Sequence, residues 1–570
     1  MDPCERALFV SRHTVRRFDD PERIVSASTL GEVRDCLASV ESAVSGGLMA
    51  AGFITYEAAS GLHSELVTQK ATELPLACFG LFRKCSDTAA MAEGTGAMDL
   101  GPWQAAVSRE EYLNGVNRIR SLIAAGDTYQ VNYTFPLRAR FAGDPVGWFR
   151  RLVDAQPTEY GAYLDFGRFK VLSVSPELFF RLDGRRLTTR PMKGTRPRGR
   201  FREEDERLRR ELLASEKERA ENAMIVDLLR NDMGRVSETG SVCVSDLFTA
   251  EPYPTVWQMT STITSETKAS FGDIVAALFP SGSVTGAPKV RTMQIIGELE
   301  PAPRGVYCGA VGWLMPGRQA QFNVAIRTVL IDTLKGAASY HVGSGITWDS
   351  EASAEYEECM AKARVLDACG AEFELVESLR YDGGYFLLDE HVDRMRWSAE
   401  RLGFRFEQNT IRSALGAAPL GSHPQKVRLL LHRTGACRTE TQPIEPIGEW
   451  RVGLAREPID TNDLFLYHKT TARAVYAQLK SGRPDCDDVI LWNRRGEVTE
   501  STIANVVAEL DGKRVTPPVA CGLLPGTMRA DLLRSGEICE RVVPMAGLTR
   551  ATRIWLVNSV RKWIPVTFVP

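Results

Sequence analysis

Hydrophobic and polar positions follow two different periods along this chain, and the change of period separates expected helices from expected strands. From residue 109, REEYLNGVNRIRSLIAAGD has apolar residues three or four positions apart and predicts a helix that ends near Gly126. Residues 203–232 predict one long charged helix that ends near Gly234. Residues 304–332 contain two β-rich runs around a Pro-Gly pair, which predicts a hairpin.

The same alternation restarts near residue 370, which indicates two domains. Residues 338–370 predict a strand, a glycine loop and a helix over 351–369. Directly afterwards, FELVESLRYDGGYFLLDEHVDRM begins a new strand–turn–strand–helix pattern. We therefore expect an α/β (α+β) protein with domains at 1–370 and 371–570, joined at 370–372 with almost no linker and closely packed.

The overall composition narrows the possible classes of function. The 570 residues include 70 Lys and Arg against 72 Asp and Glu, so no general attraction to nucleic acid or to an acidic membrane is expected. The 12 cysteines form no CxxC pair, which favours reduced thiols over disulfides or structural zinc. The first residues, MDPCERALFVSRH, are unlike a secretory signal, and no apolar run is long enough for a membrane span. We expect a cytoplasmic protein.

Two glutamates on expected helices are candidate metal ligands. Glu221 lies on the long charged helix, and Glu358 lies on the helix over 351–369 with Lys362 one turn later. Magnesium takes few carboxylates directly and keeps water or substrate oxygens, so one glutamate from each helix is a reasonable site. A glutamate on a charged helix is more often a solvated surface residue, and composition alone leaves both interpretations open.

Two glycine-containing loops are candidate anion sites. PSGSVTGAPK (280–289) and VGSGI (342–346) let backbone amides approach a phosphate or a carboxylate closely. Neither contains the GxxxxGK[ST] pattern or a complete GxGxxG pattern, so nucleotide binding is not indicated. Each loop is also compatible with an ordinary turn.

The stretch LTTRPMKGTRPRGR (187–200) contains the most unusual candidate, Lys193. Its two prolines discourage a regular helix or a central strand. A lysine nucleophile must lose its proton, which burial or cations such as Arg196 and Arg198 favour by lowering its pKa. The alternatives are a solvent-facing cation or a basic loop that contacts RNA.

The motifs of the first domain closely resemble one family when they are taken together. The chain carries, in order, SPELFF, RPMKGTRPRG, ENAMIVDLLRNDMGRV, PSGSVTGAPKVRTMQIIGELE, RGVYCGAVGW, NVAIRTV and VGSGITWDSEASAEYEECMAKA. This set resembles the chorismate-binding family of anthranilate, aminodeoxychorismate, isochorismate and salicylate synthases, over nearly all of residues 1–370. The resemblance implies two packed β-sheets with helices outside and a site for Mg²⁺ and chorismate.

The resemblance also implies roles for individual residues. Glu221 and Glu358 would bind Mg²⁺, and Glu177 of SPELF would be the acid/base that helps the ring hydroxyl leave. The residues expected to bind the substrate are Tyr307, Arg327, Ser283, Lys362 and the glycines Gly343 and Gly345.

Lys193 distinguishes members within this family. Anthranilate synthases usually carry a small residue at this position, as in PIAGTR, whereas aminodeoxychorismate synthases carry lysine, as in PIKGTR. In the latter, the lysine amine attacks ring carbon 2 and expels the C4 hydroxyl; ammonia then adds at C4 and releases the lysine. Gln258 is a departure, because relatives usually have histidine there and glutamine cannot exchange a proton near neutral pH.

Residues 371–570 carry a second set of candidates. HKTTARAVYAQLK contains Lys469, and Glu500 and the turn LLPGTMR follow it. A PLP (pyridoxal 5′-phosphate) enzyme needs a Schiff-base lysine, an acid at the pyridinium nitrogen, and a phosphate cup of backbone amides and arginine. The set resembles the fold-type IV PLP enzymes, which include branched-chain and D-amino-acid aminotransferases and aminodeoxychorismate lyase. The resemblance implies Lys469 as the catalytic lysine and, as cofactor-binding residues, Arg394, Glu500, Thr527, Met528 and Ser559.

The two resemblances imply a bifunctional enzyme of folate precursor synthesis. The first domain would convert chorismate and ammonia to 4-amino-4-deoxychorismate, and the second would eliminate pyruvate to leave 4-aminobenzoate. No glutaminase motif is visible, so ammonia would come from a separate glutamine amidotransferase subunit or from solution. A homodimer through the C-terminal domain is compatible with this interpretation. The alternatives are an anthranilate synthase in the first domain and, in the second, a D-amino-acid or branched-chain transaminase or a non-catalytic module.

Overall fold

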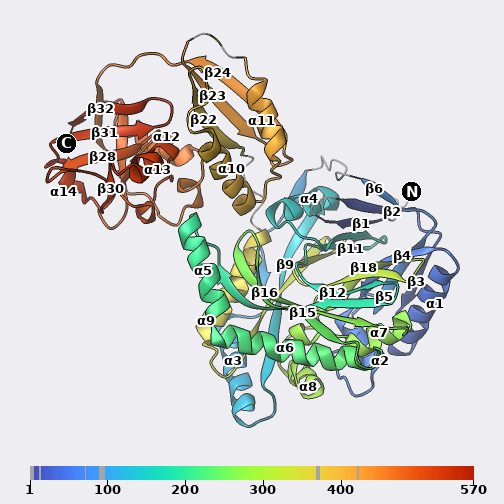
Figure 1. Cartoon of the computed structure of the whole chain (residues 1–570). Coiled ribbons are helices and arrows are strands. Elements are labelled where there is room, and N and C mark those ends of the chain that lie inside the picture. Colours follow the sequence, from blue (N-terminus) through green and yellow to red (C-terminus); the bar gives the residue numbers. More distant parts are fainter. Residues whose placement is uncertain are drawn as a thin grey trace. The chain divides into compact units, whose positions relative to one another are not determined.

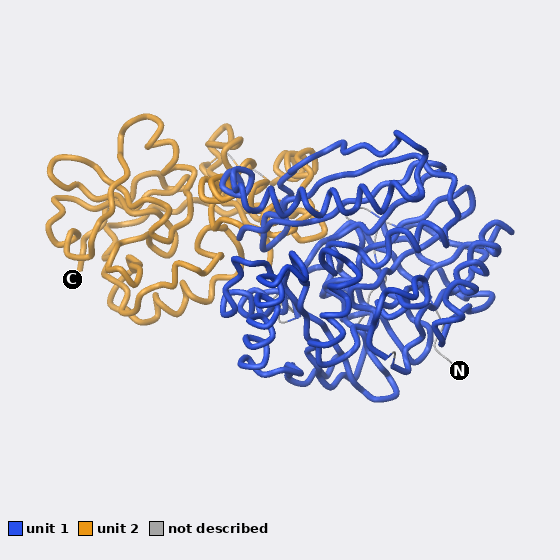
Figure 2. Tube along the Cα trace, turned by 90° about the horizontal axis from the view of Figure 1, so that it is seen from below, with its two compact units in different colours: residues 1–197, 209–370 blue, residues 198–208, 371–570 orange. Residues whose placement is uncertain are grey.

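The computed structural model describes residues 6–11, 14–70, 72–88, 91, 97–366, 373–419, 421 and 423–569. The chain divides into two compact units, one of residues 1–197 and 209–370, the other of residues 198–208 and 371–570 (Figure 2). The boundary that we expected at 370–372 falls outside the described residues. No feature of the sequence indicated that residues 198–208 belong with the C-terminal unit.

The first unit contains two large sheets whose neighbouring strands are antiparallel (Figure 1). Among the described residues, the larger sheet has the order β17 (Gly286–Ala287), β9 (Gln130–Gly143), β21 (Ala337–Ile346), β20 (Thr328–Asp332), β11 (Phe169–Ser173), β10 (Gly161–Asp165), β1 (Arg6–Val10), β2 (Val15–Asp19) and β6 (Ser86–Thr88). The short strands β7 (Met98–Leu100) and β8 (Gln104–Ala105) also pair with β9.

The other sheet of this unit carries the stretch around Lys193. Its order is β14 (Met192–Pro197), β16 (Val256–Glu266), β13 (Arg186–Arg190), β12 (Leu178–Asp183), β19 (Gln319–Val324), β18 (Ala310–Met315), β4 (Met49–Ile54), β5 (Ala77–Phe82) and β3 (Arg23–Ala27). Strand β15 (Cys243–Pro252) pairs with β16 as well. Lys193 therefore lies on the terminal strand of this sheet.

Apolar side chains fill the space between the two sheets and beneath the outer helices. Phe18 of β2 and Phe82 of β5 come from different sheets, and their ring centroids are only 5.4 Å apart. The sheet of β14 is covered by α1 (Val33–Ser45), α6 (Glu216–Gly234) and α7 (Phe271–Leu278). The sheet of β9 is covered by α3 (Arg109–Ala124), α4 (Pro145–Ala155), α8 (Lys289–Leu299) and α9 (Ala352–Ala363). The expected architecture of packed sheets with outer helices is confirmed.

Several predicted elements are confirmed, and two are wrong. Helix α3 and the β18–β19 hairpin lie where the periodicity placed them. The single charged helix over 203–232 is in fact two helices, α5 (Arg202–Ala214) and α6, because Ser215 caps α6 by accepting a hydrogen bond from the Glu218 amide. After β22 (Leu375–Tyr381) no second strand forms before α10 (Leu388–Leu402), and only an isolated bridge joins Tyr381 to Tyr385.

The C-terminal unit contains one small and one larger sheet. The small sheet has the order β22, β23 (Gln425–Leu431) and β24 (Cys437–Pro443), and it packs on α10 and α11 (Gln408–Gly416). The larger sheet has the order β27 (Val498–Ser501), β26 (Asp488–Trp492), β25 (Trp450–Leu454), β32 (Lys562–Val569), β31 (Arg553–Asn558), β28 (Asn505–Leu510), β29 (Lys513–Thr516) and β30 (Cys539–Glu540). The remaining helices are α12 (Ala474–Ser481), α13 (Thr527–Arg534) and α14 (Met545–Leu548), while the short α2 (Ala59–Leu62) belongs to the first unit.

Residues 198–208 are integrated into this second unit by backbone and ring contacts. The ring of Phe201 stacks on Tyr467 at a centroid distance of 5.7 Å. The Nε of Arg401 donates to the carbonyl oxygen of Gly199 at 3.0 Å. The stretch begins one residue after β14 ends at Pro197, so the strand that carries Lys193 leads directly into the second unit.

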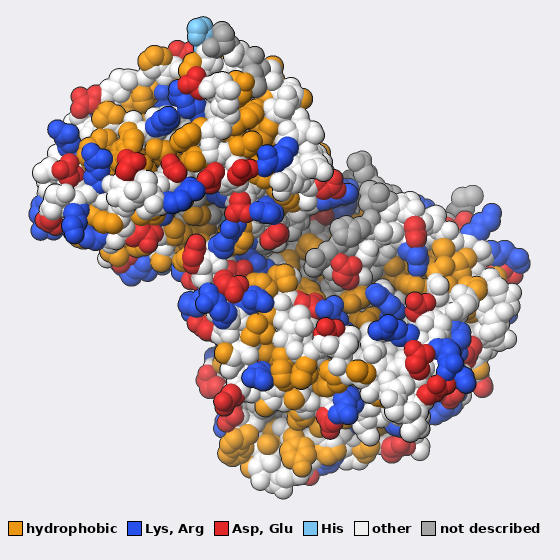
Figure 3. Space-filling model, in the orientation of Figure 1, with side chains coloured by type: hydrophobic (Ala, Val, Ile, Leu, Met, Phe, Trp, Pro, Cys, Tyr) orange, Lys and Arg blue, Asp and Glu red, His pale blue; other side chains and the backbone are white. Residues whose placement is uncertain are grey.

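Charged side chains of both signs are interspersed on the face that Figure 3 shows. This distribution agrees with the nearly equal numbers of basic and acidic residues in the sequence. In the part of the chain that the structure describes, no helix is both long and apolar enough to cross a membrane.

Candidate active sites

Helix α6 holds the strand that carries Lys193. The side-chain amide of Asn222 donates to the carbonyl oxygen of Lys193 at 3.0 Å, and its oxygen accepts from the Ser261 hydroxyl at 2.6 Å. Because Glu221 precedes Asn222 on the helix, its carboxylate comes within 3.4 Å of the Lys193 Nζ. The pairing of β14 with α6 thus brings a candidate nucleophile and a candidate metal ligand together.

The glycine strand β21 lies against the same lysine. A Cβ atom added at Gly345 would lie 2.5 Å from the Lys193 Nζ and 3.1 Å from the Gln130 Nε2. Only glycine gives the amine and the Gln130 amide room to reach this strand. Gln130 is fully buried, and neither atom of its amide has a hydrogen-bond partner among the described residues. An unsatisfied buried amide beside the Lys193 amine is a candidate contact for a polar ligand.

Glu177 and Ser283 form a buried pair near the lysine. The Ser283 hydroxyl donates to the Glu177 carboxylate at 2.6 Å, from the η3 turn (Gly282–Val284) to the residue before β12. Burial raises the pKa of Glu177 to about 7, although Ser283 and the positive charge of Lys193 partly oppose this shift. A carboxyl group with this pKa can both donate and accept a proton near neutral pH.

Helix α9 presents Glu358 and Lys362 to the glycine strand. The Lys362 Nζ lies 2.6 Å from the Glu358 carboxylate and donates to the carbonyl oxygen of Gly343 at 2.9 Å. Partial burial opposes ionisation of Glu358, but the charges of Lys362 and Lys193 hold the pKa of its carboxyl below its ordinary value. The structure therefore brings α9 and β14 to the same site.

Arg327 and Tyr307 lie at the margin of this site. The Arg327 guanidinium donates to the Gln156 side chain at 2.8 Å, and its charge also stabilises the ionised form of Glu358. The ring of Tyr307 stacks on His341 of β21 at 5.1 Å, two residues before Gly343. Both residues are compatible with the expected substrate contacts, although no described contact joins either of them to Lys193.

The positive charge around Lys193 is balanced more fully than the sequence indicated. Each arginine of the stretch has an acidic partner: Arg190 with Glu251, Arg196 with Glu218, Arg198 with Asp205, and Arg200 with Glu204. The influence of Arg196 and Arg198 on Lys193, which stays a prediction, is therefore offset by the negative charges of Glu218 and Asp205. Gln258 donates to the carbonyl oxygen of Gly194 at 2.9 Å and supports the backbone beside the lysine.

The donor set of this site fits a magnesium ion. Glu221 and Glu358 come from two helices, and Lys193 interacts with both carboxylates. No group of three or more His, Cys, Asp or Glu side chains suited to a metal occurs among the described residues. Magnesium does not require such a group, because it completes its coordination with water and substrate oxygens.

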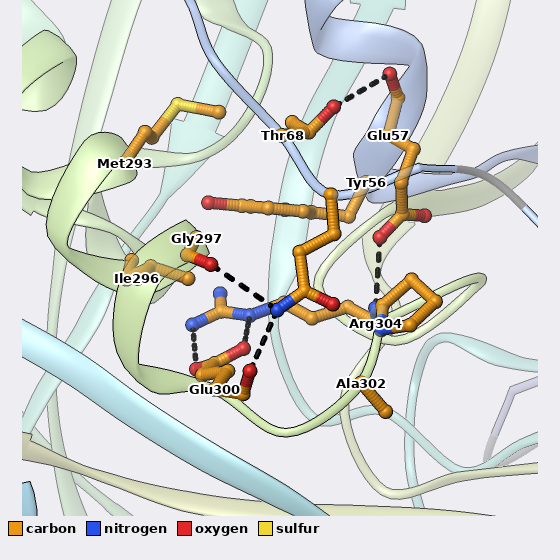
Figure 4. A pocket seen from close by; sticks show the side chains of 11 residues that line it. Tyr56, Glu57, Thr68, Met293, Ile296, Gly297, Glu300, Ala302 and Arg304 are labelled. Atoms are coloured by element: carbon orange, nitrogen blue, oxygen red, sulfur yellow. Dashed lines mark hydrogen bonds and ion pairs between the residues drawn. The ribbon is translucent and has the colours of Figure 1, made fainter.

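A small pocket lies next to a buried ion pair that contacts the η3 turn of Ser283. Tyr56, Glu57, Glu300 and Arg304 line it, and Arg304 pairs with Glu300 at 2.6 Å (Figure 4). Its volume of about 10 Å³ holds no more than about one water molecule. Arg304 also donates to the carbonyl oxygen of Val284 at 2.8 Å, so the buried Arg304–Glu300 pair helps to hold the η3 turn in position.

Lys469 is held beside β22 in the C-terminal unit. The Val376 amide donates to the carbonyl oxygen of Lys469 at 3.0 Å, and Thr470 bridges to Leu375. Burial, assisted by the charge of Arg394, lowers the pKa of Lys469 to about 8. About a tenth of an amine with this pKa is uncharged at pH 7, far more than of an ordinary lysine, and only the uncharged form can attack a carbonyl group.

Glu500 is buried and is surrounded by hydrogen-bond donors. Its carboxylate accepts from the Tyr476 hydroxyl at 2.9 Å, the Leu524 amide at 3.2 Å and the Asn505 amide at 3.3 Å. Burial nevertheless raises the pKa of Glu500 to about 8. A buried carboxyl group of this kind gains stability when a positively charged ring nitrogen pairs with it.

The N-terminus of α13 and Arg394 complete a set that fits a phosphate group. Thr527 and Met528 are the first two residues of α13, where backbone amides have no acceptor inside the helix. Arg394 donates to Glu377 at 2.6 Å and to the carbonyl oxygen of Pro525 at 3.1 Å, directly before this helix. The Ser559 hydroxyl donates to the carbonyl oxygen of Ser378 at 3.2 Å. With Lys469 and Glu500, these donors have the chemistry that pyridoxal phosphate requires.

Sequence reasoning missed Gln130, Glu377 and His391. Glu377 and His391 are both 1% exposed, and the Nδ1 of His391 lies 2.6 Å from the Glu377 carboxylate. Buried charged residues are uncommon, so a glutamate within the apolar run of β22 is a usable signal. Gln130 gave no such signal, because its unsatisfied amide is visible only after β9 and β21 pair.

Comparison with known families supports both parts of the sequence resemblance. A family described as "chorismate binding enzyme" matches residues 3–367. A family described as "Amino-transferase class IV" matches residues 374–569. Each match falls on the region whose motifs indicated it.

Individual relatives are similar to the first unit. Aminodeoxychorismate synthase component 1 of Bacillus subtilis is 42% identical over 265 residues, which are 46% of this chain and 56% of that protein. Anthranilate synthase component 1 of Aquifex aeolicus is 42% identical over 270 residues, 47% of this chain and 54% of that protein. The chain thus spans a little over half the length of these relatives. The crystal structure of anthranilate synthase component I from Streptococcus pneumoniae has a TM-score of 0.57 and 26% identity, covering 62% of this chain and 92% of that one.

Proposed function

The chain belongs to the chorismate-binding enzyme family, and from this premise we propose that it makes 4-aminobenzoate in two consecutive reactions. The first unit joins chorismate and ammonia to give 4-amino-4-deoxychorismate. The second removes pyruvate from this product and leaves the aromatic amine. Relatives named "component 1" support a separate glutamine amidotransferase as the source of ammonia.

Lys193 acts as the nucleophile of the first reaction. Its neutral amine bonds to ring carbon 2 while the double bond shifts and the C4 hydroxyl departs, taking a proton from Glu177. Ammonia then bonds to C4 as the C2–N bond breaks, which frees the neutral Lys193 amine, and the new C4 ammonium group returns one proton to Glu177. Glu221 and Glu358 would hold a magnesium ion, which supplies positive charge for the substrate carboxylate.

The position of the Lys193 amine carries this proposal. The amine lies close to Gly345 and 3.4 Å from the Glu221 carboxylate, and its positive charge acts on Glu177. Percentage identity does not separate the candidate functions, since synthases of both kinds are 42% identical to the chain. A small side chain at position 193 would leave no nucleophile, whereas lysine supplies one. The residue therefore favours aminodeoxychorismate formation over anthranilate formation.

The second reaction uses the residues around Lys469. Pyridoxal phosphate, when bound, supplies an electron sink for proton removal and elimination. Arg394 and the amides of Thr527 and Met528 would bind its phosphate. Glu500 would hold the proton on its ring nitrogen, and the Lys469 amine would move a proton at the substrate carbon.

A product assay with three proteins tests both reactions. The parent, Lys193→Ala and Lys469→Ala are each incubated with chorismate, ammonia and Mg²⁺, and pyruvate and 4-aminobenzoate are measured. We expect 4-aminobenzoate only from the parent, and accumulating aminodeoxychorismate from Lys469→Ala. Anthranilate from the parent, undiminished in Lys193→Ala, would instead identify an anthranilate synthase. Aminodeoxychorismate accumulating unchanged with the parent would rule out the lyase and leave a transaminase or a non-catalytic module.

A further inference from the structure

A chain of buried side chains runs from β22 to the first residue of α13. Glu377 accepts two hydrogen bonds from Arg394, at 2.9 and 2.6 Å, and lies 2.6 Å from the Nδ1 of His391. The Nε2 of the same histidine lies 3.2 Å from the Thr527 hydroxyl. His391 and Arg394 can both reach Glu377 because residues three apart share one face of α10.

The protonation state of this chain follows from its partners. Burial alone would raise the pKa of Glu377, but Arg394 and His391 lower it to about 2, so the carboxylate is ionised and accepts only. The Nδ1 of His391 must therefore carry a hydrogen. Burial lowers the pKa of His391, and the neutral ring then has its lone pair on Nε2. The tautomer is assigned from this network.

Every element packed around His391 contributes a group that decides its charge. Glu377 on β22 favours the protonated ring. Arg394 on α10 and Lys469, in the loop before α12, disfavour it. Thr527 on α13 is neutral and can either donate to the ring or accept from it. A phosphate dianion in the site would add a negative charge, which favours the protonated ring.

The direction of the Thr527 hydrogen bond matters for an anion at α13. While His391 is neutral, Thr527 donates its single hydrogen to Nε2 and presents lone pairs to its other neighbours. A phosphate dianion beside the helix would meet those lone pairs. If Nε2 gains a proton, it donates to Thr527, whose own hydrogen becomes available for the phosphate oxygen.

We propose that His391, positioned by Glu377, takes up one proton when the cofactor phosphate binds, and that Thr527 passes this change to the phosphate. The inference rests on the proposed use of pyridoxal phosphate by this unit. His391 and Glu377 are positioning residues, since they act through Thr527 and Arg394. The proton comes from solvent and forms an N–H bond at the Nε2 of His391, and the hydrogen bond between this nitrogen and Thr527 reverses its direction.

Proton uptake can be measured separately from activity. The cofactor-free full chain is titrated calorimetrically with pyridoxal 5′-phosphate at about pH 7.5, where the phosphate is mostly a dianion, in two buffers of different ionisation enthalpy. Pyridoxal, which lacks the phosphate, is the matched ligand, because it makes the same bond to Lys469. We expect the phosphate form to take up about one proton more than pyridoxal.

Four variants connect this difference to the proposed chain. In His391→Gln and Thr527→Val the extra proton should disappear and the affinity for the phosphate form should fall about tenfold, roughly the effect of one lost hydrogen bond. Thr527→Ser keeps the hydroxyl and should keep the extra proton. His432→Gln changes an exposed histidine of the same unit and should behave as the parent. Thr527→Val alone decides the matter if His391→Gln does not fold.

The outcomes separate this proposal from the proposed function. Equal proton uptake for the two ligands in the parent overturns it, and so does a difference that persists in both His391→Gln and Thr527→Val. In either case an absorbance band at roughly 410 nm, typical of the lysine adduct, would leave the proposed cofactor in place. Absence of this band in the parent would contradict the proposed function itself, and this inference with it.

Discussion

The two units prepare the same functional group, a lysine amine, in opposite ways. Lys193 keeps a carboxylate partner, with Glu221 at 3.4 Å. Lys469 is partly buried near Arg394, and no ion pair to it is found in the described part of the chain. Burial in the C-terminal unit therefore shifts the Lys469 amine towards its neutral form. In the first unit, the Lys193 amine keeps an ion-pair partner, Glu221, which is also a candidate metal ligand.

One buried glutamate in each unit, Glu177 and Glu500, has a raised pKa, and the two differ in their hydrogen-bond partners. Burial raises the pKa of Glu177 to about 7 and that of Glu500 to about 8. Both are enclosed, but their hydrogen-bond partners differ: a single hydroxyl for Glu177, and three donors for Glu500. We therefore expect Glu177 to exchange its proton during turnover and Glu500 to serve as a fixed partner of a positively charged group. Burial alone therefore does not determine the role of a glutamate, whereas its hydrogen-bond partners distinguish the two cases.

The largest expected effect is that of Lys193→Ala on the first reaction. Loss of a covalent nucleophile should reduce aminodeoxychorismate formation by about a thousandfold or more. The measurement is the initial rate with chorismate, ammonia and Mg²⁺. Lys335→Ala, which changes an exposed lysine of the same unit, serves as the control. A Lys193→Ala rate close to that of the parent would show that Lys193 is not the nucleophile of the first reaction.

Glu177→Gln should have the next largest effect. The amide cannot give a proton to the departing hydroxyl, and the expected loss is about 10²- to 10⁴-fold. In the parent, the acid must be protonated, so the rate of the first reaction should fall as pH rises through about 7. A pH–rate profile from pH 5.5 to 9 checks the sign. The fall should be absent from the residual rate of Glu177→Gln, and a fall that persists in this variant would mean that another group titrates.

Gly345→Ala tests how closely the glycine strand fits the lysine. The new Cβ would lie 2.5 Å from the Lys193 Nζ and must displace it. Displacement of a reacting atom by about 1 Å costs on the order of a hundredfold, and we expect a loss of that size. Gly297→Ala, where nothing lies within 4 Å of the added carbon, should leave the rate unchanged. Equal rates for Gly345→Ala and the parent would show that the lysine does not use this position.

The smallest expected effect is that of Gln258→Ala. It removes the hydrogen bond to Gly194 and loosens the backbone next to Lys193. One lost hydrogen bond corresponds to roughly 1 kcal/mol, so we expect about a fivefold slower first reaction with unchanged chemistry in the second unit. Complete loss of activity would indicate that Gln258 touches the substrate. Steady-state kinetics of each reaction separately distinguish the two results.

Much of this fold is visible in the sequence because local patterns determine it. The period of α3 and the Pro-Gly turn of the β18–β19 hairpin act over a few residues. The break at Ser215 was missed because a serine inside a charged run is ambiguous until its side chain caps a helix. Membership of residues 198–208 in the second unit depends on contacts with Tyr467 and Arg401, which no local pattern reveals.

Some residues of the candidate sites could be predicted from the sequence, and others could not. Lys193, Glu221 and Lys469 could be identified because their residue types stand in recognisable motifs. Gln130 and His391 could not, because a buried amide without a partner and a histidine between two elements exist only after the chain folds. Electrostatic balance was also hidden: the acids that neutralise the arginines near Lys193 come from other segments.

The most direct test is to mix the two single variants, each of which retains one intact unit. Lys469→Ala should make aminodeoxychorismate and stop, and Lys193→Ala should be able to consume it. The mixture, supplied with chorismate, ammonia, Mg²⁺ and pyridoxal phosphate, should therefore release 4-aminobenzoate and pyruvate, although neither protein does so alone. No 4-aminobenzoate from the mixture, or as much from Lys193→Ala alone as from the parent, would contradict the assignment of one lysine to each reaction.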